Sequence, residues 1–285
     1  MPLQQLVEHF NNRFAYENQA RLHPFTIDKD QVNGLFGPIR ISSGFDLIRK
    51  TENYESIVGH SAHITVAPSS SQDLGITNLG HLLTHTVKES EDFQSIINLD
   101  RLSRTVHMLN YLKLIQLGGT LFLDVDPRHI LSVKKDHGVY FEEIIIKCGL
   151  VTNKVAISLS ITPFYALHHT QLLVGLHNYR QRGYKIALNI GPLYTTNGLQ
   201  DLMSKLAPDY LRINAPSIDK PTSSGDPFWP SALKSLAELQ RLLGGQTLLQ
   251  QVDHQEQAWI APSIGIDLIQ GQYCDKVVVD HLRCL

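Results

Sequence analysis

The sequence predicts an α/β protein folded as a (β/α)8 TIM-like barrel. Short apolar segments that end in polar residues alternate with segments of helical periodicity along the C-terminal two thirds of the chain. This alternation indicates parallel strands joined by right-handed helical crossovers. The length of 285 residues suits one barrel domain, 1–285, better than two domains. The strand candidates are 120–127, 154–163, 184–192, 210–216, 247–253 and 265–272.

Helical segments separate these strand candidates. Apolar residues recur three and four positions apart in the first of them, so that one face of the helix can pack on the barrel. A glycine follows four of the helices, where a residue in the left-handed conformation commonly ends a helix. The glycines are Gly118, Gly149, Gly183 and Gly244. The predicted helices cover 98–115, 138–148, 166–182, 197–206 and 231–243.

The N-terminal third is less regular. Residues 2–13 have the apolar spacing of a short amphipathic helix. Segments 16–22 and 32–42 are rich in strand-forming residues and flank a turn-rich segment, which predicts an antiparallel hairpin at the start of the barrel. Pro38 cannot donate to a ladder, so the second strand is expected to lie at an edge or to end there. Residues 43–95 set no firm period and are left open between strand, loop and helix.

Composition excludes several classes of function. A formal net charge of −2 gives no basic footprint for nucleic acid or anionic lipid. No apolar run approaches the roughly 20 residues that span a bilayer, and the N-terminus lacks the layout of a signal peptide. The cysteines Cys148, Cys274 and Cys284 have no CxxC spacing, which argues against a disulfide framework or a zinc site. We therefore expect a reduced, cytoplasmic protein without nucleic-acid binding or membrane insertion.

Polar residues at the ends of the predicted strands are the candidate site. In a barrel of this type the C-terminal ends of the strands surround one mouth, where ligands bind. His81 and His85 have a spacing that zinc ligands can have, but no third ligand accompanies them, and we interpret them as surface residues. The strand-end residues are Asp124, Ser158, Asn189, Arg212 and Gln250.

Four sequence segments together resemble the EAL domain, the bacterial cyclic di-GMP phosphodiesterase module. They are LFLDVDPRHI (121–130), VKKDHGVYFEEII (133–145), PDYLRIN (208–214) and GIDLIQGQY (265–273). The resemblance covers about residues 14–278 and implies an EAL-type (β/α)8 barrel with an antiparallel first strand. It also implies a stand-alone domain, because no sensor or cyclase sequence accompanies it.

The resemblance implies a degenerate active site. Active members hold two divalent metals through carboxylates and an asparagine at strand ends. The signature Glu-Ala-Leu aligns with 36–38, and the metal-binding and catalytic positions fall on residues of other types. Arg40, at a position that contacts the nucleotide phosphate in the family, and Gln270 are retained. The replaced positions are Phe36 for the first Glu, Asp124 for an Asn, Ser158 for a Glu, Asn189 and Ile190 for paired aspartates, Arg212 for a catalytic Lys and Gln250 for a late Glu.

These replacements argue against hydrolysis. A two-metal site needs several carboxylates to offset its positive charge, and the aligned acidic ligands are absent. Arg212 stays protonated and cannot accept a proton as a lysine with a lowered pKa could. Four nearby carboxylates could in principle hold a single metal, but we interpret them as partners of backbone amides or of Arg212. They are Asp124, Asp126, Asp209 and Asp253. We expect no catalytic residue, no metal and no cofactor.

Three functions remain open at this point. The first is a catalytically inactive EAL-like regulator in bacterial signalling that binds a signalling protein or a transcription regulator, with a possible homodimer. The second is a non-hydrolysing cyclic di-GMP receptor in which Arg40 and Arg212 pair with phosphates; binding of the dinucleotide, like active hydrolysis, ranks below the first function. A third is an unrelated enzyme that uses the same barrel mouth, although no nucleophile and base pair supports it.

Overall fold

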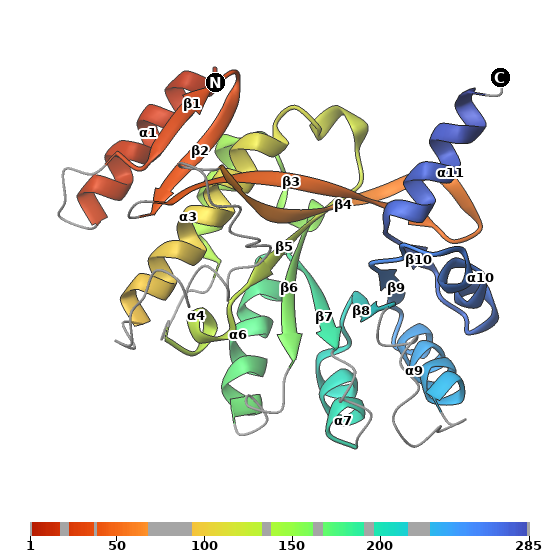
Figure 1. Cartoon of the computed structure of the whole chain (residues 1–285). Helices are drawn as coiled ribbons and strands as arrows, with labels where there is room; N and C mark the ends of the chain where they lie inside the picture. The colour runs from red at the N-terminus through yellow and green to blue at the C-terminus, as the bar shows by residue number, and fades with distance from the viewer. Residues whose placement is uncertain are drawn as a thin grey trace.

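A computed structural model describes residues 2–17, 23–36, 39–67, 93–132, 138–161, 168–190, 197–215 and 229–283. Strands form a closed barrel, with helices packed around its outside (Figure 1). Neighbouring strands from β4 to β10 are parallel, whereas β3 runs antiparallel to both β4 and β10 and closes the barrel between them. The α/β barrel with an antiparallel first strand is confirmed. Its strands are β3 (Ile39–Lys50), β4 (Asn53–Ala67), β5 (Thr120–Val125), β6 (Val155–Ile161), β7 (Lys185–Ile190), β8 (Tyr210–Asn214), β9 (Gln246–Gln250) and β10 (Leu268–Ile269).

The five predicted helices are present, within a few residues of their expected ends. Helices α4, α10 and α11 were not predicted. Gly149, Gly183 and Gly244 have φ values of 75°, 89° and 83°, the positive φ expected of a residue that ends a helix. Gly118 has a φ of 71° but a ψ of −166°, so it lies outside the left-handed helical region that was expected. Within the described ranges no helix has the length and apolar character to cross a membrane. The helices are α3 (Phe93–Tyr111), α4 (Pro127–Ser132), α5 (Val139–Lys147), α6 (His169–Gln181), α7 (Asn197–Leu206), α9 (Trp229–Leu242), α10 (Gln255–Ser263) and α11 (Gln272–Arg283).

The N-terminal hairpin lies one segment later in the chain than predicted. Helix α1 (Leu3–Glu17) extends beyond 2–13, so the strand expected at 16–22 is wrong in its first two residues, and 18–22 lie outside the described residues. The hairpin strands are β1 (Phe25–Asp28) and β2 (Gln31–Phe36). Lys29 and Asp30 join them with φ values of 47° and 64°, the conformation of a type I′ turn. A Lys-Asp pair is a weak signal for that turn, which usually carries glycine or asparagine.

The segment 32–42 is two strands rather than one. β2 ends at Phe36 and β3 begins at Ile39, and the two pair antiparallel. The β1–β2 hairpin thereby extends the sheet outward from β3 and lies beside α1, away from α11 (Figure 1). Pro38 itself is outside the described residues, and the end of β2 two residues before it agrees with the expected break.

Residues 43–67 form a long hairpin that the sequence left undetermined. β3 and β4 pair from Arg40 with Ala67 to Lys50 with Asn53. Both strands carry buried apolar residues, among them Ile41, Ile48 and Ile64, but small and polar residues interrupt them, so the sequence sets no firm apolar period. This hairpin supplies the first two strands of the barrel. His81 and His85 lie outside the described residues.

The barrel interior is filled by side chains, which confines the site to one mouth. The rings of Phe122 and Tyr210 lie 4.7 Å apart between centroids inside the barrel. Burying each such ring contributes roughly 1.5–3 kcal/mol to stability. A larger apolar core lies between the strands and the surrounding helices. The inner layer comprises Ile48, Phe122, Ala156, Ala187, Tyr210, Leu248 and Leu268.

Candidate functional site

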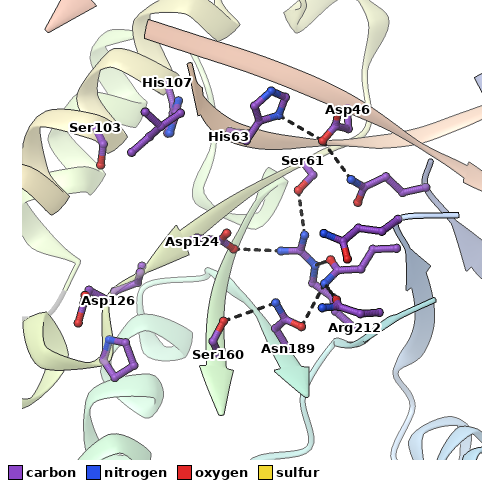
Figure 2. A pocket seen from close by; sticks show the side chains of 18 residues that line it. Asp46, Ser61, His63, Ser103, His107, Asp124, Asp126, Ser160, Asn189 and Arg212 are labelled. Carbon is purple, nitrogen blue, oxygen red and sulfur yellow. Dashed lines mark hydrogen bonds and ion pairs between the residues drawn. The ribbon is translucent and has the colours of Figure 1, made fainter. Parts of the chain in front are cut away.

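Arg212 lies at the centre of the barrel mouth. Its Nε donates to Oε1 of Gln250 at 2.9 Å, and Nη1 donates to Oδ1 of Asp124 at 3.0 Å and to Oγ of Ser158 at 2.7 Å. Nη2 donates to Oγ of Ser61 at 2.9 Å. Figure 2 shows the guanidinium pointing from β8 toward Ser61 and Asp124. Only 5% of the Arg212 side chain is exposed. Its buried charge is stabilised by hydrogen bonds to residues on four other strands.

Parallel register explains why these residues meet. Asp124 pairs with Ser158 across β5 and β6, and Asn189 pairs with Arg212 across β7 and β8. Gln250, at the end of β9, donates from Nε2 to Oδ1 of Asn189 at 3.1 Å. These contacts bring Asp124, Ser158, Asn189, Arg212 and Gln250 together at one mouth.

A cavity of about 500 Å³ opens above Arg212. Its walls include Asp46 and His63 from the β3–β4 hairpin and Ser103 and His107 from α3. Figure 2 shows the two histidines on the side of the cavity that faces α3 and β4. The Arg212 cluster forms the floor, and Phe122 lies beneath it with its ring centroid 5.7 Å from the guanidinium carbon.

Asp46 and His63 form an ion-pair contact in the cavity wall. Nδ1 of His63 lies 3.2 Å from Oδ2 of Asp46, and Nε2 of Gln270 donates to the same oxygen at 3.1 Å. The contact with Asp46 raises the pKa of His63, although burial acts in the opposite direction. Gly44 makes room for this ring, because a Cβ there would lie 2.2 Å from Nε2 of His63.

His107 is the buried counterpart of His63. Its Nδ1 lies 2.7 Å from Oγ of Ser43, and burial lowers the pKa of His107 to about 3, with further contributions from the charges of His63 and Arg104. The imidazole is therefore neutral at physiological pH. The pKa of His63 is therefore raised and the pKa of His107 is lowered, although both rings lie in the same cavity wall.

Two predicted site residues lie away from the cavity, in the N-terminal part of the sheet. Phe36 ends β2, outside the barrel, and packs against the main apolar core. Arg40 is on β3 with 43% of its side chain exposed, and its nearest carboxylate is that of Asp28 at 3.9 Å. The expectation that Phe36 and Arg40 line the mouth is wrong, because the alignment of the family's Glu-Ala-Leu signature with 36–38 places these residues on strands that lie away from the cavity.

Two further predicted residues sit near strand ends without lining the cavity. Ile190 ends β7 with 4% exposure and belongs to the apolar core. Asp253 follows β9, is exposed, and accepts from the backbone N of Gln272 at 3.4 Å. Gln270, by contrast, lines the cavity.

Five residues of the site were not predicted from the sequence, namely Ser61, Asp46, His63, Ser103 and His107. The first three lie on the β3–β4 hairpin, where no apolar period was recognised. Ser61 pairs with Phe122 across β4 and β5, so β4 is the strand that precedes Asp124 in the ring. The sequence predicts helix α3, but no sequence pattern distinguishes Ser103 and His107, which line the cavity, from the other polar residues of the helix.

The remaining carboxylates have local partners, as interpreted from the sequence. Asp126 bonds to Nη2 of Arg128 at 2.6 Å. Asp209 lies at the opposite end of the strands, where it accepts from Nη2 of Arg180 at 3.1 Å and from the backbone N of Ile186 at 2.8 Å. Among the residues that the structure describes, no three His, Cys, Asp or Glu side chains are grouped to hold a metal ion.

The residues at the floor do not fit a pair of divalent metals. Around the guanidinium stand two hydroxyls, two amides and one carboxylate, that of Asp124. Hard cations such as Mg²⁺ prefer carboxylate oxygens, and a two-metal site needs several of them. Asp124 supplies the one carboxylate bonded to the guanidinium, so the floor lacks the carboxylates that such a pair needs.

Comparisons with known proteins identify the fold. No protein-family model matches the chain, and no curated protein matches it. Solved structures of EAL domains do match. The Bacillus subtilis YkuI protein, with an EAL domain and in complex with substrate cyclic di-GMP and calcium, is 21% identical with a TM-score of 0.61 over 82% of this chain and 54% of YkuI. The chain therefore has the EAL-domain fold and spans about half the length of YkuI.

Two other bacterial proteins have the same fold. Klebsiella pneumoniae BlrP1 in a manganese and cyclic di-GMP complex is 17% identical, with a TM-score of 0.64 over 81% of this chain and 54% of BlrP1. BlrP1 with FMN and cyclic di-GMP but no metal ions has a TM-score of 0.57 at 16% identity, over 81% of this chain and 51% of BlrP1. A standalone versatile EAL protein from Vibrio cholerae O395, in its cyclic di-GMP bound form, is 15% identical with a TM-score of 0.61 over 81% of this chain and 89% of its own.

Proposed function

We propose that this chain is a catalytically inactive EAL-fold regulator that acts through protein–protein contact in bacterial signalling. The observation that carries the proposal is the guanidinium of Arg212, bonded between strand ends at the barrel mouth. We infer that Ser61, rather than Phe36, occupies the first position of the family's metal-binding ring, because β4 precedes β5 in the barrel. With Ser61 in this position, the metal-binding ring still lacks the glutamate that the family has there.

Electrostatics supports the loss of metal-dependent hydrolysis. Two unit charges 4 Å apart interact by about 4 kcal/mol at an effective dielectric constant of about 20, so a dication that close to Arg212 would be repelled by about 8 kcal/mol. Asp124 offsets only one positive charge. Arg212 also cannot serve as a general base, because its guanidinium remains protonated.

Exposed apolar side chains on the outer helices support a role in protein contact. Trp259 on α10 is 68% exposed and Ile146 on α5 is 64% exposed. Tryptophan is among the side chains that most often contribute strongly to binding at protein interfaces. A homodimer is one assembly that such exposed side chains would allow, and light scattering of the purified chain measures it.

A cyclic di-GMP receptor is the second candidate. It is favoured by the metal-free complex of BlrP1 with FMN and cyclic di-GMP, in which a protein with this fold holds the dinucleotide. In this chain, however, Arg40 lies away from the cavity and four bonds engage the N–H groups of Arg212. Fewer cationic groups therefore remain for phosphates.

One experiment separates these functions. Purified protein is titrated with cyclic di-GMP with and without Mn²⁺, by calorimetry and with chromatography of the nucleotide products. The proposal predicts no products, together with recovery of a stoichiometric protein partner from native lysate. A Kd near 1 μM, about −8 kcal/mol, without products indicates the receptor instead. A monomer that captures no stoichiometric partner contradicts the proposal.

A further inference from the structure

Strand β4 extends beyond its pairing with β5. β4 ends at Ala67, but its pairing with β5 ends where Ser61 pairs with Phe122. On its other side, β4 stays paired with β3 as far as Ala67. Beyond Ser61 the strands β4 and β5 therefore diverge, and the β5-facing side of β4 has no strand partner in the part of the chain that the structure describes.

The cavity at the barrel mouth reaches this unpaired edge. Four consecutive residues of β4, 61–64, line the cavity, and so do residues 124–127 at the end of β5. Successive side chains of a strand point to opposite faces of the sheet, so a cavity bordered by every residue of such a run lies along the main chain. Figure 2 shows Ser61 and His63 on the β4 side and Asp124 and Asp126 on the β5 side. The cavity is thus a groove between the edges of two strands.

Main-chain groups along the groove are open to a ligand. The N–H and C=O groups of a strand point in alternation to its two neighbours. Among the described residues, only those of β3 bond to the main chain of 62–66. A row of unpaired N–H and C=O groups is a template on which another chain can pair.

The fold blocks the other free edge of the sheet. β1 is the outermost strand, and Asn11 of α1 lies against it. Nδ2 of Asn11 donates to the carbonyl oxygen of Phe25 at 2.9 Å, and the N–H of Phe25 donates to Oδ1 of Asn11 at 2.9 Å. These two bonds occupy the groups that a further strand would use. The edge of β1 is therefore protected at Phe25, whereas that of β4 beyond Ser61 is not.

The charged side chains in the groove pair with one another. Arg212 lies 3.0 Å from Asp124. His63 lies 3.2 Å from Asp46. His107 is neutral, because burial lowers its pKa to about 3. Side-chain charge therefore favours neither an anion nor a cation, and the unpaired main chain is the feature that remains for recognition.

We propose that β4 accepts an extended segment of a protein partner, which pairs with residues 62–66 and lies in the groove as an additional strand. The inference rests on the proposed function, since it names the way in which the regulator holds its partner. Donors and acceptors alternate along a strand edge, and another extended main chain matches that pattern over several residues.

The groove has room for such a segment. Five residues of β4 present about 17 Å of edge. Alternate side chains of the added strand would enter the cavity of about 500 Å³ that lies above Arg212. The main-chain bonds would supply affinity, and the fit of these alternate side chains would supply specificity.

The test uses selected peptides as probes and the full chain as the target. Random peptides of about ten residues, long enough to span this edge, are displayed on phage and selected against the protein. Enriched sequences are synthesised, and calorimetry measures their Kd. In matched analogues one main-chain N–H at a time is replaced by an N-methyl group.

The methylated peptides should show a period of two. Only alternate residues of an added strand bond to β4. Methylation at these positions should weaken binding at least about tenfold, a difference of about 1.4 kcal/mol, and at the positions between them less than about twofold. Losses without this period, or no enriched peptide, overturn the inference.

Two substitutions at Asp124, on the β5 side of the groove, locate the site. Asp124→Trp fills the groove and should weaken peptide binding at least about tenfold. Asp124→Asn removes the same charge without adding volume and should change the Kd less than about twofold. The side chain is 66% exposed, and circular dichroism confirms that each variant is folded. Equal binding by the wild type and Asp124→Trp, or equal losses in the two variants, contradicts recognition by the strand edge.

Amide hydrogen exchange examines the edge without any substitution. In the free protein, N–H groups of 62–66 that point away from β3 should exchange faster than those of 59–61 that bond to β5. A bound peptide should slow this exchange. Slow exchange before peptide is added would show that the chain covers its own edge, which overturns the inference.

Failure here is distinct from failure of the proposed function. A chain that is inactive toward cyclic di-GMP and yet enriches no peptide loses only this inference. A chain that hydrolyses the dinucleotide loses the proposed function whatever the peptides do.

Discussion

The guanidinium of Arg212 and the carboxylate of Asp124 lie 3.0 Å apart, the first 5% exposed and the second 66% exposed. The pair joins β8 to β5 across the barrel mouth. Because the arginine is the buried partner, its charge is held mainly by neutral oxygens of Ser61, Ser158 and Gln250. The mouth is thus built around an internal cation.

Replacing Arg212 should destabilise the fold. In Arg212→Met the acceptors at four strand ends lose their common donor, and we expect a loss of about 2–4 kcal/mol in the free energy of unfolding. Urea denaturation measures it. Lys205→Met is the matched control, since Lys205 bonds to Asp201 on an exposed helix surface and should change stability by less than about 0.5 kcal/mol. Equal losses of unfolding free energy in Arg212→Met and Lys205→Met would show that the hydrogen bonds of Arg212 make no specific contribution to stability.

His107 should make stability fall in mild acid. Burial lowers the pKa of His107 in the folded state to about 3 from an ordinary value of 6.5. Its contribution to the free energy of unfolding is therefore complete above pH 6.5 and is lost as the pH falls toward 3. One such group gives a slope of about 1.4 kcal/mol per pH unit. Between pH 6.5 and pH 5 the wild type should lose about 2 kcal/mol more than His107→Gln. If the unfolding free energies of the wild type and His107→Gln changed equally with pH, the lowered pKa of His107 would be contradicted.

His63 should titrate with the opposite shift. Asp46 raises its pKa, so His63 stays protonated to a higher pH than an ordinary histidine. In Asp46→Asn the pKa of His63 should fall, which an NMR titration of its Cε1 proton follows directly. Asp280→Asn lies far away and should leave this titration unchanged. An unaltered pKa in Asp46→Asn would mean that the ion pair is not formed in solution.

Gly59 marks a close approach of β4 to β5. A Cβ at this position would lie 2.6 Å from the carbonyl oxygen of Thr120. Gly59→Ala should therefore force the strands apart at a cost of about 1–3 kcal/mol. Gly149→Ala meets nothing within 4 Å and adds only the penalty of a left-handed backbone, about 1 kcal/mol. A smaller loss for Gly59→Ala than for Gly149→Ala would contradict this packing.

The predictable parts of the molecule are those with strong local patterns. Strands β5 to β9 each carry an apolar run that ends in a polar residue, and parallel pairing then places Asp124, Ser158, Asn189, Arg212 and Gln250 together. Their convergence follows from the rule that parallel strands end at one face.

The unpredictable parts depend on long-range pairing. Nothing local distinguishes β2, which extends the sheet, from β4, which closes the barrel with Ser61 at its mouth. The pairing of β3 with β10 joins segments more than two hundred residues apart. The lowered pKa of His107 likewise depends on burial against a distant segment, since its ring bonds to Ser43, 64 residues earlier in the chain.

The most direct test of the central claim is an assay of cyclic di-GMP hydrolysis by the purified chain in millimolar Mn²⁺, with EDTA as the matched control. Because the strand ends around Arg212 present one carboxylate rather than the several that two metals need, we predict no linear dinucleotide above the level formed without protein. Product that appears with Mn²⁺ and disappears with EDTA would contradict the account.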